Sequence, residues 1–161
     1  ISECLVGSEM CIRDRNMGIT TDSKPIYKCV LVIDNTQPTG IIANIASILS
    51  ITLGKKACDI VGHDVLDKQG EIHSGITRCP IPILGASPET IKEVRERLRS
   101  FDAKDMVLVD FSTVAQQAKT YEEYEQGMRE TDEADLCYMG IGIYAEKRII
   151  NKATGNLSLI R

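Results

Sequence analysis

Short apolar runs alternate with longer amphipathic stretches along most of the chain. Three runs are apolar on both faces, which is typical of buried strands: residues 26–34, 105–111 and 136–144. Helical spacing and capping residues predict helices at 38–54, 88–101 and 120–128, with a short basic helix ending at Gly155. Strands that alternate with helices in one domain predict an α/β layer architecture with a mixed, mostly parallel central sheet.

The first predicted helix has a thin polar side. It opens at Pro38 and stops at Gly54, and its polar residues Asn44, Ser47 and Ser50 interrupt an otherwise apolar sequence. Two interpretations follow: the helix is either sandwiched in the core or carries a partner on this small-residue stripe.

The second predicted helix is amphipathic. Its apolar positions keep a helical spacing: Ile91, Val94, Leu98 and Phe101. Three basic residues share another face, interpreted as solvated or, alternatively, as a weak phosphate patch: Lys92, Arg95 and Arg99.

An inserted β-hairpin is predicted around the turn at residues 67–70, which begins with Asp and ends with Gly. A regular register would pair Val65 with Ile72 and Asp64 with His73. The following segment "CPIPIL", residues 79–84, contains two prolines that cannot donate to a ladder, which predicts an edge strand or an extended cover.

Composition favours a cytoplasmic protein that does not enter membranes. The 161 residues suffice for one domain, and the net charge of -4 supplies no general attraction to nucleic acid. No apolar run is long enough to span a bilayer, the six cysteines show no Cys-x-x-Cys spacing, and no signal peptide is recognisable. Residues 1–15 resemble translated sequencing-adaptor sequence, so residues 1–25 are predicted to be non-native or flexible and residues 26–161 to form a single domain.

Polar residues follow two of the predicted strands, where open α/β sheets bind ligands. Asp110 is the candidate catalytic acid/base, and five residues are candidate ligand contacts: Asp34, Thr39, Asn44, Thr113 and Gln116. The competing interpretation is that both turns are ordinary capped connections. The two histidines and their acidic neighbours fit no standard metal spacing, so no metal is predicted, and nucleotide-binding loops and hydrolase elbows are absent from the sequence.

Four segments carry a resemblance to the family called Domain of Unknown Function 2000. They are "KCVLVIDNTQPTGIIANIASILSITLGKK", "GITRCPIPIL", "DMVLVDFSTVAQQAKTYEEYE" and "GIGIYAEKRIINKATGNLSLIR". The resemblance implies the fold of the type-II peptidyl-tRNA hydrolases, a mixed sheet of about four strands with helices on both faces. The closing segment is also similar to the end of those hydrolases, on Lys152, Thr154, Gly155, Leu157 and Leu159.

The same resemblance implies altered chemistry. Two lysines that the hydrolases carry after the first strand fall on Pro38 and Gly40, their glutamine falls on Asn44, and their histidine falls on Ser47. The acidic residue is retained as Asp110.

Three functional hypotheses therefore stand. The first is a protein without cofactors that binds a small polar ligand, or acts as a metal-independent hydrolase, in a cleft at the strand carboxyl ends. There Asp110 would be the acid/base, and Thr39 and Asn44 would be donors. The second is a peptidyl-tRNA hydrolase that recruits Lys152 or Arg148 as its cation. The third is a non-enzymatic homodimeric binding module that uses the first helix or the "CPIPIL" segment.

Overall fold

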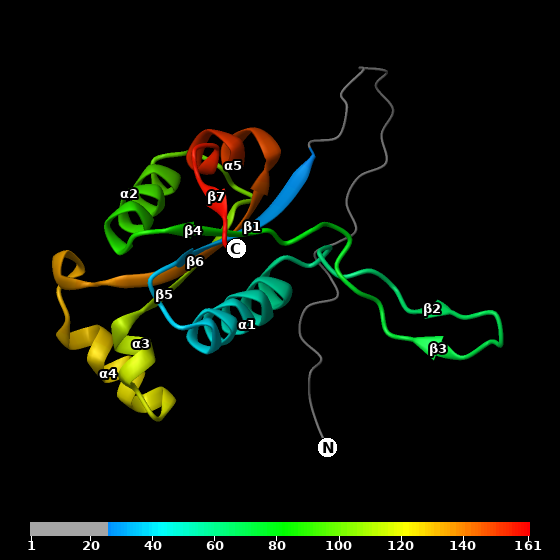
Figure 1. The fold of residues 1–161 in the computed structure, drawn as a ribbon, viewed down its shortest axis with the longest axis horizontal. Coiled ribbons are helices and arrows are strands. Elements are labelled where there is room, and N and C mark those ends of the chain that lie inside the picture. Colours follow the sequence, from blue (N-terminus) through cyan, green and yellow to red (C-terminus); the bar gives the residue numbers. More distant parts are fainter. Residues whose placement is uncertain (1–25) are drawn as a thin grey trace.

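The computed structural model describes residues 26–161, so the predictions for residues 1–25 lie outside the described part of the chain. Five strands form one sheet in the order β5-β6-β1-β4-β7 (Figure 1). Their bounds are β1 Tyr27–Asp34, β4 Ile83–Ala86, β5 Val107–Ser112, β6 Tyr138–Glu146 and β7 Ser158–Leu159. Only β1 and β4 are parallel, whereas the other three pairs are antiparallel. The α/β class and the mixed sheet are confirmed, with five strands where about four were predicted, but the prediction that the sheet is mostly parallel was wrong.

The direction of β6 explains this difference. After β5 the chain passes through helices α3 (Thr113–Gln117), α4 (Tyr121–Glu130) and η1 (Glu133–Asp135). The backbone N–H of Thr113 donates to the carbonyl of Cys137 at 3.0 Å, so this excursion returns to the edge that it left. Strand β6 therefore begins beside the end of β5 and runs back between β5 and β1. An apolar run predicts that a strand is buried, but it does not encode this direction.

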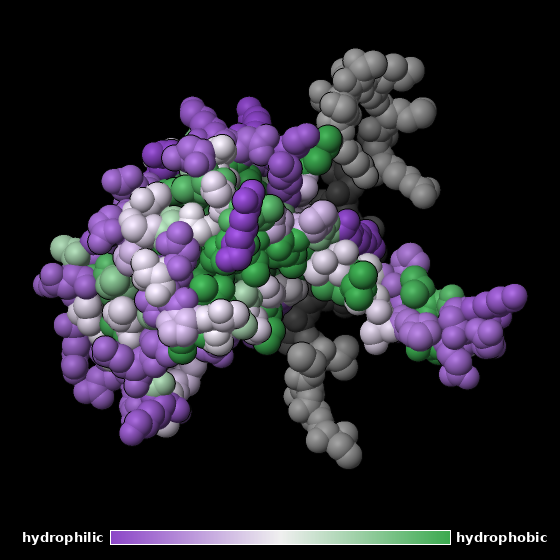
Figure 2. Space-filling model, in the orientation of Figure 1, coloured by the Kyte–Doolittle hydropathy of each residue, from purple (hydrophilic) through white to green (hydrophobic). Residues whose placement is uncertain are grey.

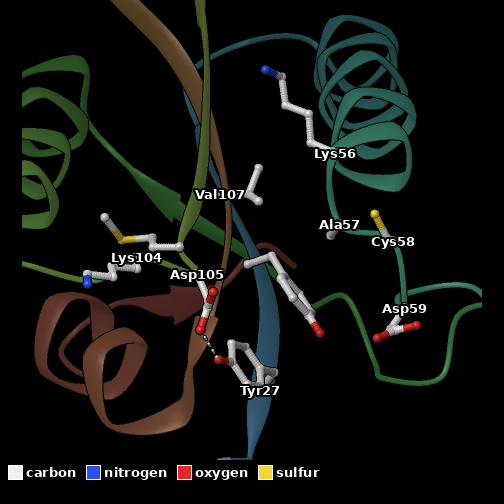
Figure 3. A pocket seen from close by; sticks show the side chains of 10 residues that line it. Tyr27, Lys56, Ala57, Cys58, Asp59, Lys104, Asp105 and Val107 are labelled. Carbon is white, nitrogen blue, oxygen red and sulfur yellow. Dashed lines mark hydrogen bonds between the residues drawn. The ribbon is translucent and has the colours of Figure 1, made fainter. Parts of the chain in front are cut away.

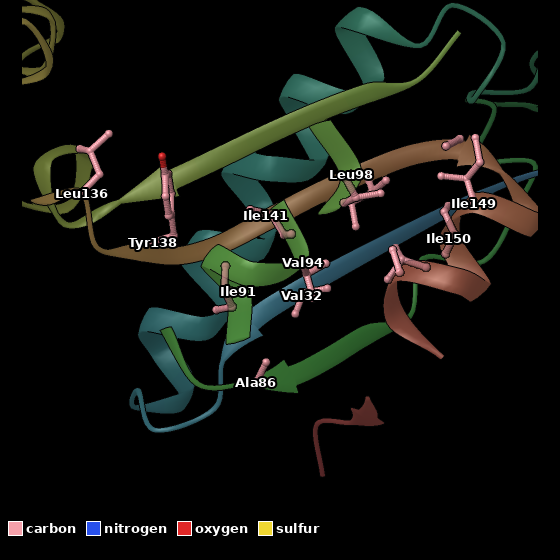
Figure 4. Close-up of a cluster of buried hydrophobic side chains, with 14 residues drawn as sticks. Val32, Ala86, Ile91, Val94, Leu98, Leu136, Tyr138, Ile141, Ile149 and Ile150 are labelled. Carbon is pink, nitrogen blue, oxygen red and sulfur yellow. The ribbon is translucent and has the colours of Figure 1, made fainter. Parts of the chain in front are cut away.

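Helices cover both faces of the sheet, which is why its central strands are apolar on both faces (Figure 1). Helix α1 (Thr39–Lys56) packs Ile45, Leu49 and Leu53 against one face. Helices α2 (Pro88–Arg99) and α5 (Lys147–Thr154) cover the opposite face, where the side chains of Val32, Ile91, Leu98 and Ile150 form the second core cluster (Figure 4).

Helix α1 lies close to β6 because two glycines of that strand face it. A Cβ added to Gly140 would lie 2.8 Å from Ile45 Cγ2, and one added to Gly142 would lie 2.9 Å from Leu53 Cδ1. Both distances are shorter than normal packing contacts. The glycines therefore set the separation between the helix and the sheet.

The proline-rich segment leads into an interior strand. Of its two predictions, the edge strand was wrong, and residues 79–82, which contain both prolines, lie outside any strand. Strand β4 begins at Ile83, after both prolines, and lies between β1 and β7. Pro82 takes part only as an acceptor, since its carbonyl receives the N–H of Leu31 at 3.0 Å. A proline in that position needs no N–H of its own.

The predicted hairpin is present and projects from the body (Figure 1). Strands β2 (Val65–Leu66) and β3 (Ile72–His73) pair Val65 with His73 and Leu66 with Ile72, one residue away from the predicted register. The loop has five residues instead of four because the N–H of Asp67 donates to the carbonyl of Glu71, and Gly70 adopts a φ of 89°. Residues 61–78 are called the arm below.

Candidate functional site

The side chain of Asp34, a predicted ligand contact, forms its hydrogen bonds within its own turn. Asp34 is the last residue of β1 and is 2% exposed. It accepts hydrogen bonds from the N–H and hydroxyl of Thr36 at 3.0 and 2.8 Å and from Gln37 Nε2 at 2.7 Å. Burial raises the pKa of this carboxyl, but the three hydrogen bonds outweigh burial and leave the pKa below its ordinary value. Asp34 therefore holds the turn that leads into α1.

The other predicted contacts are spread over different elements. Thr39 and Asn44 are exposed on α1, whereas Thr113 and Gln116 lie in α3. Within residues 26–161, no side-chain hydrogen bond or ion pair joins any two of the six predicted site residues. That these residues share one cleft remains a prediction, without a contact that supports it.

Asp110, the predicted acid/base, forms an ion pair with Arg95 of α2. Arg95 Nε lies 2.8 Å from Asp110 Oδ2, and the side chains are only 14% and 27% exposed. The guanidinium also lies 4.6 Å from the centre of the Tyr138 ring. Burial lowers the pKa of Arg95, but the hydrogen bond and the charge of Asp110 outweigh it and raise that pKa. Arg95 therefore stays protonated at neutral pH.

Further carboxylates surround the same arginine. Arg95 Nη1 lies 2.9 Å from Glu96 and 3.3 Å from Glu133, and Arg99 also pairs with Glu133. The network ties α2 and η1 to β5. The hydroxyl of Tyr138 is buried nearby and forms no hydrogen bond with any residue of 26–161.

Arg95 was missed because it was assigned, with Lys92 and Arg99, to a face of α2 interpreted as solvated. A signal was nevertheless present in the sequence. Position 95 lies four residues after Ile91 and three before Leu98, and both of these are fully buried. This spacing places Arg95 beside the apolar stripe instead of opposite it.

A cavity of about 470 Å³ lies at the opposite edge of the sheet, where β1 begins and α1 ends (Figure 3). Tyr27 of β1 and Tyr144 of β6 form one wall, with ring centroids 5.3 Å apart and planes inclined by 18°. The Tyr27 hydroxyl donates to Asp105 Oδ2 at 3.2 Å. The volume of this cavity falls within the range of small-molecule binding sites.

Four charged side chains line this cavity, two of each sign. They are Lys56, Lys104, Asp59 and Asp105. In the described part of the chain neither lysine forms an ion pair. We call the cavity lined by these four residues and the two tyrosines the tyrosine cleft.

The two tyrosines of the cleft keep their protons at neutral pH. Burial, followed by the charge and hydrogen bond of Asp105, raises the pKa of Tyr27. Burial also raises the pKa of Tyr144, with smaller contributions from Cys79 and Asp59. Both rings therefore offer neutral aromatic surface. The Tyr144 hydroxyl is available as a hydrogen-bond donor, whereas that of Tyr27 already donates to Asp105.

Sequence analysis did not predict the tyrosine cleft. The first predicted helix stopped at Gly54, before Lys56, and Tyr27 and Tyr144 were interpreted only as strand residues. Tyr144 of β6 pairs with Cys29 of β1 on one side and with Val107 of β5 on the other. The cleft therefore depends on β6 lying between β1 and β5. No local pattern carries that arrangement.

The cations considered for a hydrolase lie elsewhere. Arg148 Nε pairs with Glu146 at 2.6 Å, and Lys152 Nζ lies 5.3 Å from the centre of the Phe101 ring. Both line a separate hollow of about 220 Å³. Neither bonds to Asp110.

Two structural features are absent from residues 26–161. No group of three or more His, Cys, Asp or Glu side chains is arranged to hold a metal ion. No helix of this part is long and apolar enough to cross a membrane.

Comparison with known proteins places this chain in a family. The model of the family described as protein of unknown function, DUF2000, matches residues 27–161. The chain belongs to the DUF2000 family. No curated protein matches this DUF2000 chain.

A solved structure supports the fold of this DUF2000 protein. It is that of a protein of unknown function from Agrobacterium tumefaciens strain C58, with a TM-score of 0.73 and 14% sequence identity. The match covers 83% of this chain and 96% of that chain. At this identity the likeness concerns the fold alone, and the resemblance to type-II peptidyl-tRNA hydrolases remains a prediction.

Proposed function

We propose that this protein binds a small zwitterionic ligand with a flat unsaturated group in the tyrosine cleft. The observation that carries this proposal is the composition of the cleft, which two lysines and two carboxylates line together with a stacked pair of neutral tyrosines. Lysines would receive the anionic group of the ligand, Asp59 would receive its cationic group, and the aromatic wall would contact its flat part. The ligand is thus small and polar, as the sequence predicts, although the site lies at the other edge of the sheet.

Phenylalanine and two analogues test this proposal by isothermal titration calorimetry. Phenylpropanoate lacks the amino group, and phenethylamine lacks the carboxylate. Lys56→Gln should weaken binding of phenylalanine and phenylpropanoate about tenfold, equivalent to about 1.4 kcal/mol, and should leave phenethylamine unchanged.

Lys55→Gln is the matched control because Lys55 neighbours Lys56 in the same helix end but does not line the cleft. Equal losses in the Lys55 and Lys56 variants would reject the cleft as the site. Failure of all three probes to bind the unmodified protein would reject this ligand class.

Hydrolysis of an ester such as peptidyl-tRNA is a second candidate, favoured by one observation. Arg95, 2.8 Å from Asp110, is a cation in a place where the sequence comparison found none. Asp110 would act as the base toward water, and Arg95 would stabilise the developing oxyanion. The surrounding Glu96 and Glu133 weigh against a phosphate ligand, since they already engage this arginine.

Release of the acyl group from an N-acetylated aminoacyl-tRNA decides between the candidates. A hydrolase centred on Asp110 should lose about 100-fold or more in rate with Asp110→Asn. Identical slow release with and without the unmodified protein would reject hydrolysis.

A further inference from the structure

The arm carries large apolar side chains in contact with solvent. Leu66, Ile72 and Ile76 are 69%, 72% and 83% exposed, and Val61 and Val65 are about half exposed. In the described part of the chain, strands β2 and β3 pair only with each other. A lone two-stranded ribbon is marginally stable in water because no second layer covers it. The arm therefore lacks the packing that the other strands have.

Polar contacts nevertheless hold the arm in a defined shape. Asp67 Oδ1 accepts the N–H groups of Gln69 and Glu71 at 2.8 and 2.9 Å. At the base, Asp64 Oδ1 accepts the N–H of Gly75 at 2.9 Å. The apolar side chains project from a fixed ribbon, and Figure 2 shows several of them on the surface of the arm.

The outer face of α1 is a second apolar surface that no other part of residues 26–161 covers. Its sequence contains no charged residue between Thr39 and Gly54, and Ile48 and Ile51 are 39% and 74% exposed. The hydroxyl of Ser47 donates to the carbonyl of Ala43 within the helix, at 2.8 Å, so it offers no free donor along this face. A helix with so little polarity on any side is normally covered on all sides.

A hollow of about 380 Å³ adjoins this helix face. Its apolar lining comes from α1, β5 and the following helices, and includes Ile48, Phe111, Ala115 and Tyr121. We call this hollow and the outer face of α1 the α1 surface. It offers space for branched aliphatic side chains. Asp110 and Lys119 also line the hollow, whereas the helix itself carries no charged residue between Thr39 and Gly54.

We propose that the arm of one copy packs on the α1 surface of a second copy, and that two reciprocal contacts form a dimer with two-fold symmetry. One chain carries both complementary surfaces, so two copies satisfy both without a further partner. Seven exposed aliphatic side chains, five on the arm and two on α1, are available to this contact, and each partner of a stable complex buries on the order of 800 Å². A second copy therefore fits the chemistry of both surfaces.

Light scattering coupled to size-exclusion chromatography tests the dimer on the full chain. The unmodified protein should have a mass near twice 17.8 kDa. An arm variant, Leu66→Asp with Ile72→Asp, and a helix variant, Ile51→Glu, should each have the mass of the monomer. All three positions are exposed, so circular dichroism should be unchanged.

Leu159→Asp is the matched control because Leu159 is also a large exposed aliphatic residue, 58% exposed, but lies outside both surfaces. It should remain a dimer. A monomeric unmodified protein, or dimeric arm and helix variants, would overturn the proposal.

Mixing the arm variant with the helix variant tests whether the two surfaces contact each other. The mixed pair retains one intact contact, between the arm of the helix variant and the α1 surface of the arm variant. Native mass spectrometry should therefore detect heterodimers in excess of either homodimer. Equal or smaller amounts of heterodimer would show that the arm does not bind α1.

Discussion

Two charged side chains near the carboxyl ends of β1 and β5 are held by hydrogen bonds, one within its own turn and one across two elements. Asp34 is enclosed by its own turn, and Arg95 joins Asp110 while stacking on Tyr138. Charges so far from water are costly unless partners compensate for the lost hydration. We expect these residues to contribute to stability whatever the protein binds.

Asp34→Asn should reveal this contribution through its pH dependence. The pKa of Asp34 is lowered in the folded protein, so its stabilising effect is complete above the unfolded pKa of about 3.9 and is lost as the pH falls through the folded value. Urea unfolding at pH 7 should show a loss of about 1–2 kcal/mol, and the difference between the two proteins should close in strong acid.

The control for this prediction is Asp102→Asn, because Asp102 is exposed and accepts no side-chain hydrogen bond from a described residue. It should change the unfolding free energy by less than about 0.5 kcal/mol. A loss for Asp34→Asn that is as large in strong acid as at pH 7 would contradict the assigned role.

At the scale of elements, the packing of α1 on β6 depends on backbone atoms as much as on side chains. Gly140 and Gly142 let Ile45 and Leu53 approach the strand directly. Protein interiors are close-packed, so an added methyl group must displace a neighbour. By contrast, an added Cβ at Gly54, within α1, would meet no atom within 4 Å.

Opposite effects are therefore expected from the same substitution in these two elements. Gly140→Ala should destabilise the protein by about 1–3 kcal/mol, since the new Cβ would lie 2.8 Å from Ile45. Gly54→Ala should stabilise it by about 0.5–1 kcal/mol because alanine favours the helix. Denaturant unfolding measures both, and a neutral Gly140→Ala would show that α1 can shift away without cost.

At the scale of the molecule, the two edges of the sheet carry different chemistry. The edge where β1 and β5 end holds the Asp110–Arg95 network, whereas the edge where they begin holds the tyrosine cleft. The arm projects separately from the body (Figure 1). The tyrosine cleft is separate from the Asp110–Arg95 network, whereas Asp110 also lines the hollow of the α1 surface that is proposed as the dimer contact.

Deletion of residues 1–15 should leave the melting temperature unchanged. This part of the sequence shows no periodic apolar pattern, and the family match begins only at residue 27. Calorimetry of the full and shortened chains measures the effect. A drop of several degrees, which for this size corresponds to about 1 kcal/mol or more, would show that these residues belong to the fold.

The sequence by itself determined which segments form the central elements. Runs that are apolar on both faces became β1, β5 and β6, because only strands covered on both sides bury such residues. Local capping was equally predictable, since Ser87 accepts the N–H of Thr90 and Thr120 accepts that of Glu123, as expected for helix starts. These features depend on residues close in the chain, whose interactions a sequence pattern can express.

Only the tertiary structure decided strand direction and the partners of the charged residues. The antiparallel return of β6 brings Tyr144 beside Tyr27, and the docking of α2 brings Arg95 to Asp110. The predicted role of Asp110 rested on its position after a strand, which does not reveal an arginine fifteen residues earlier. Each such contact joins elements distant in sequence, and its geometry follows from how whole faces pack rather than from any local pattern.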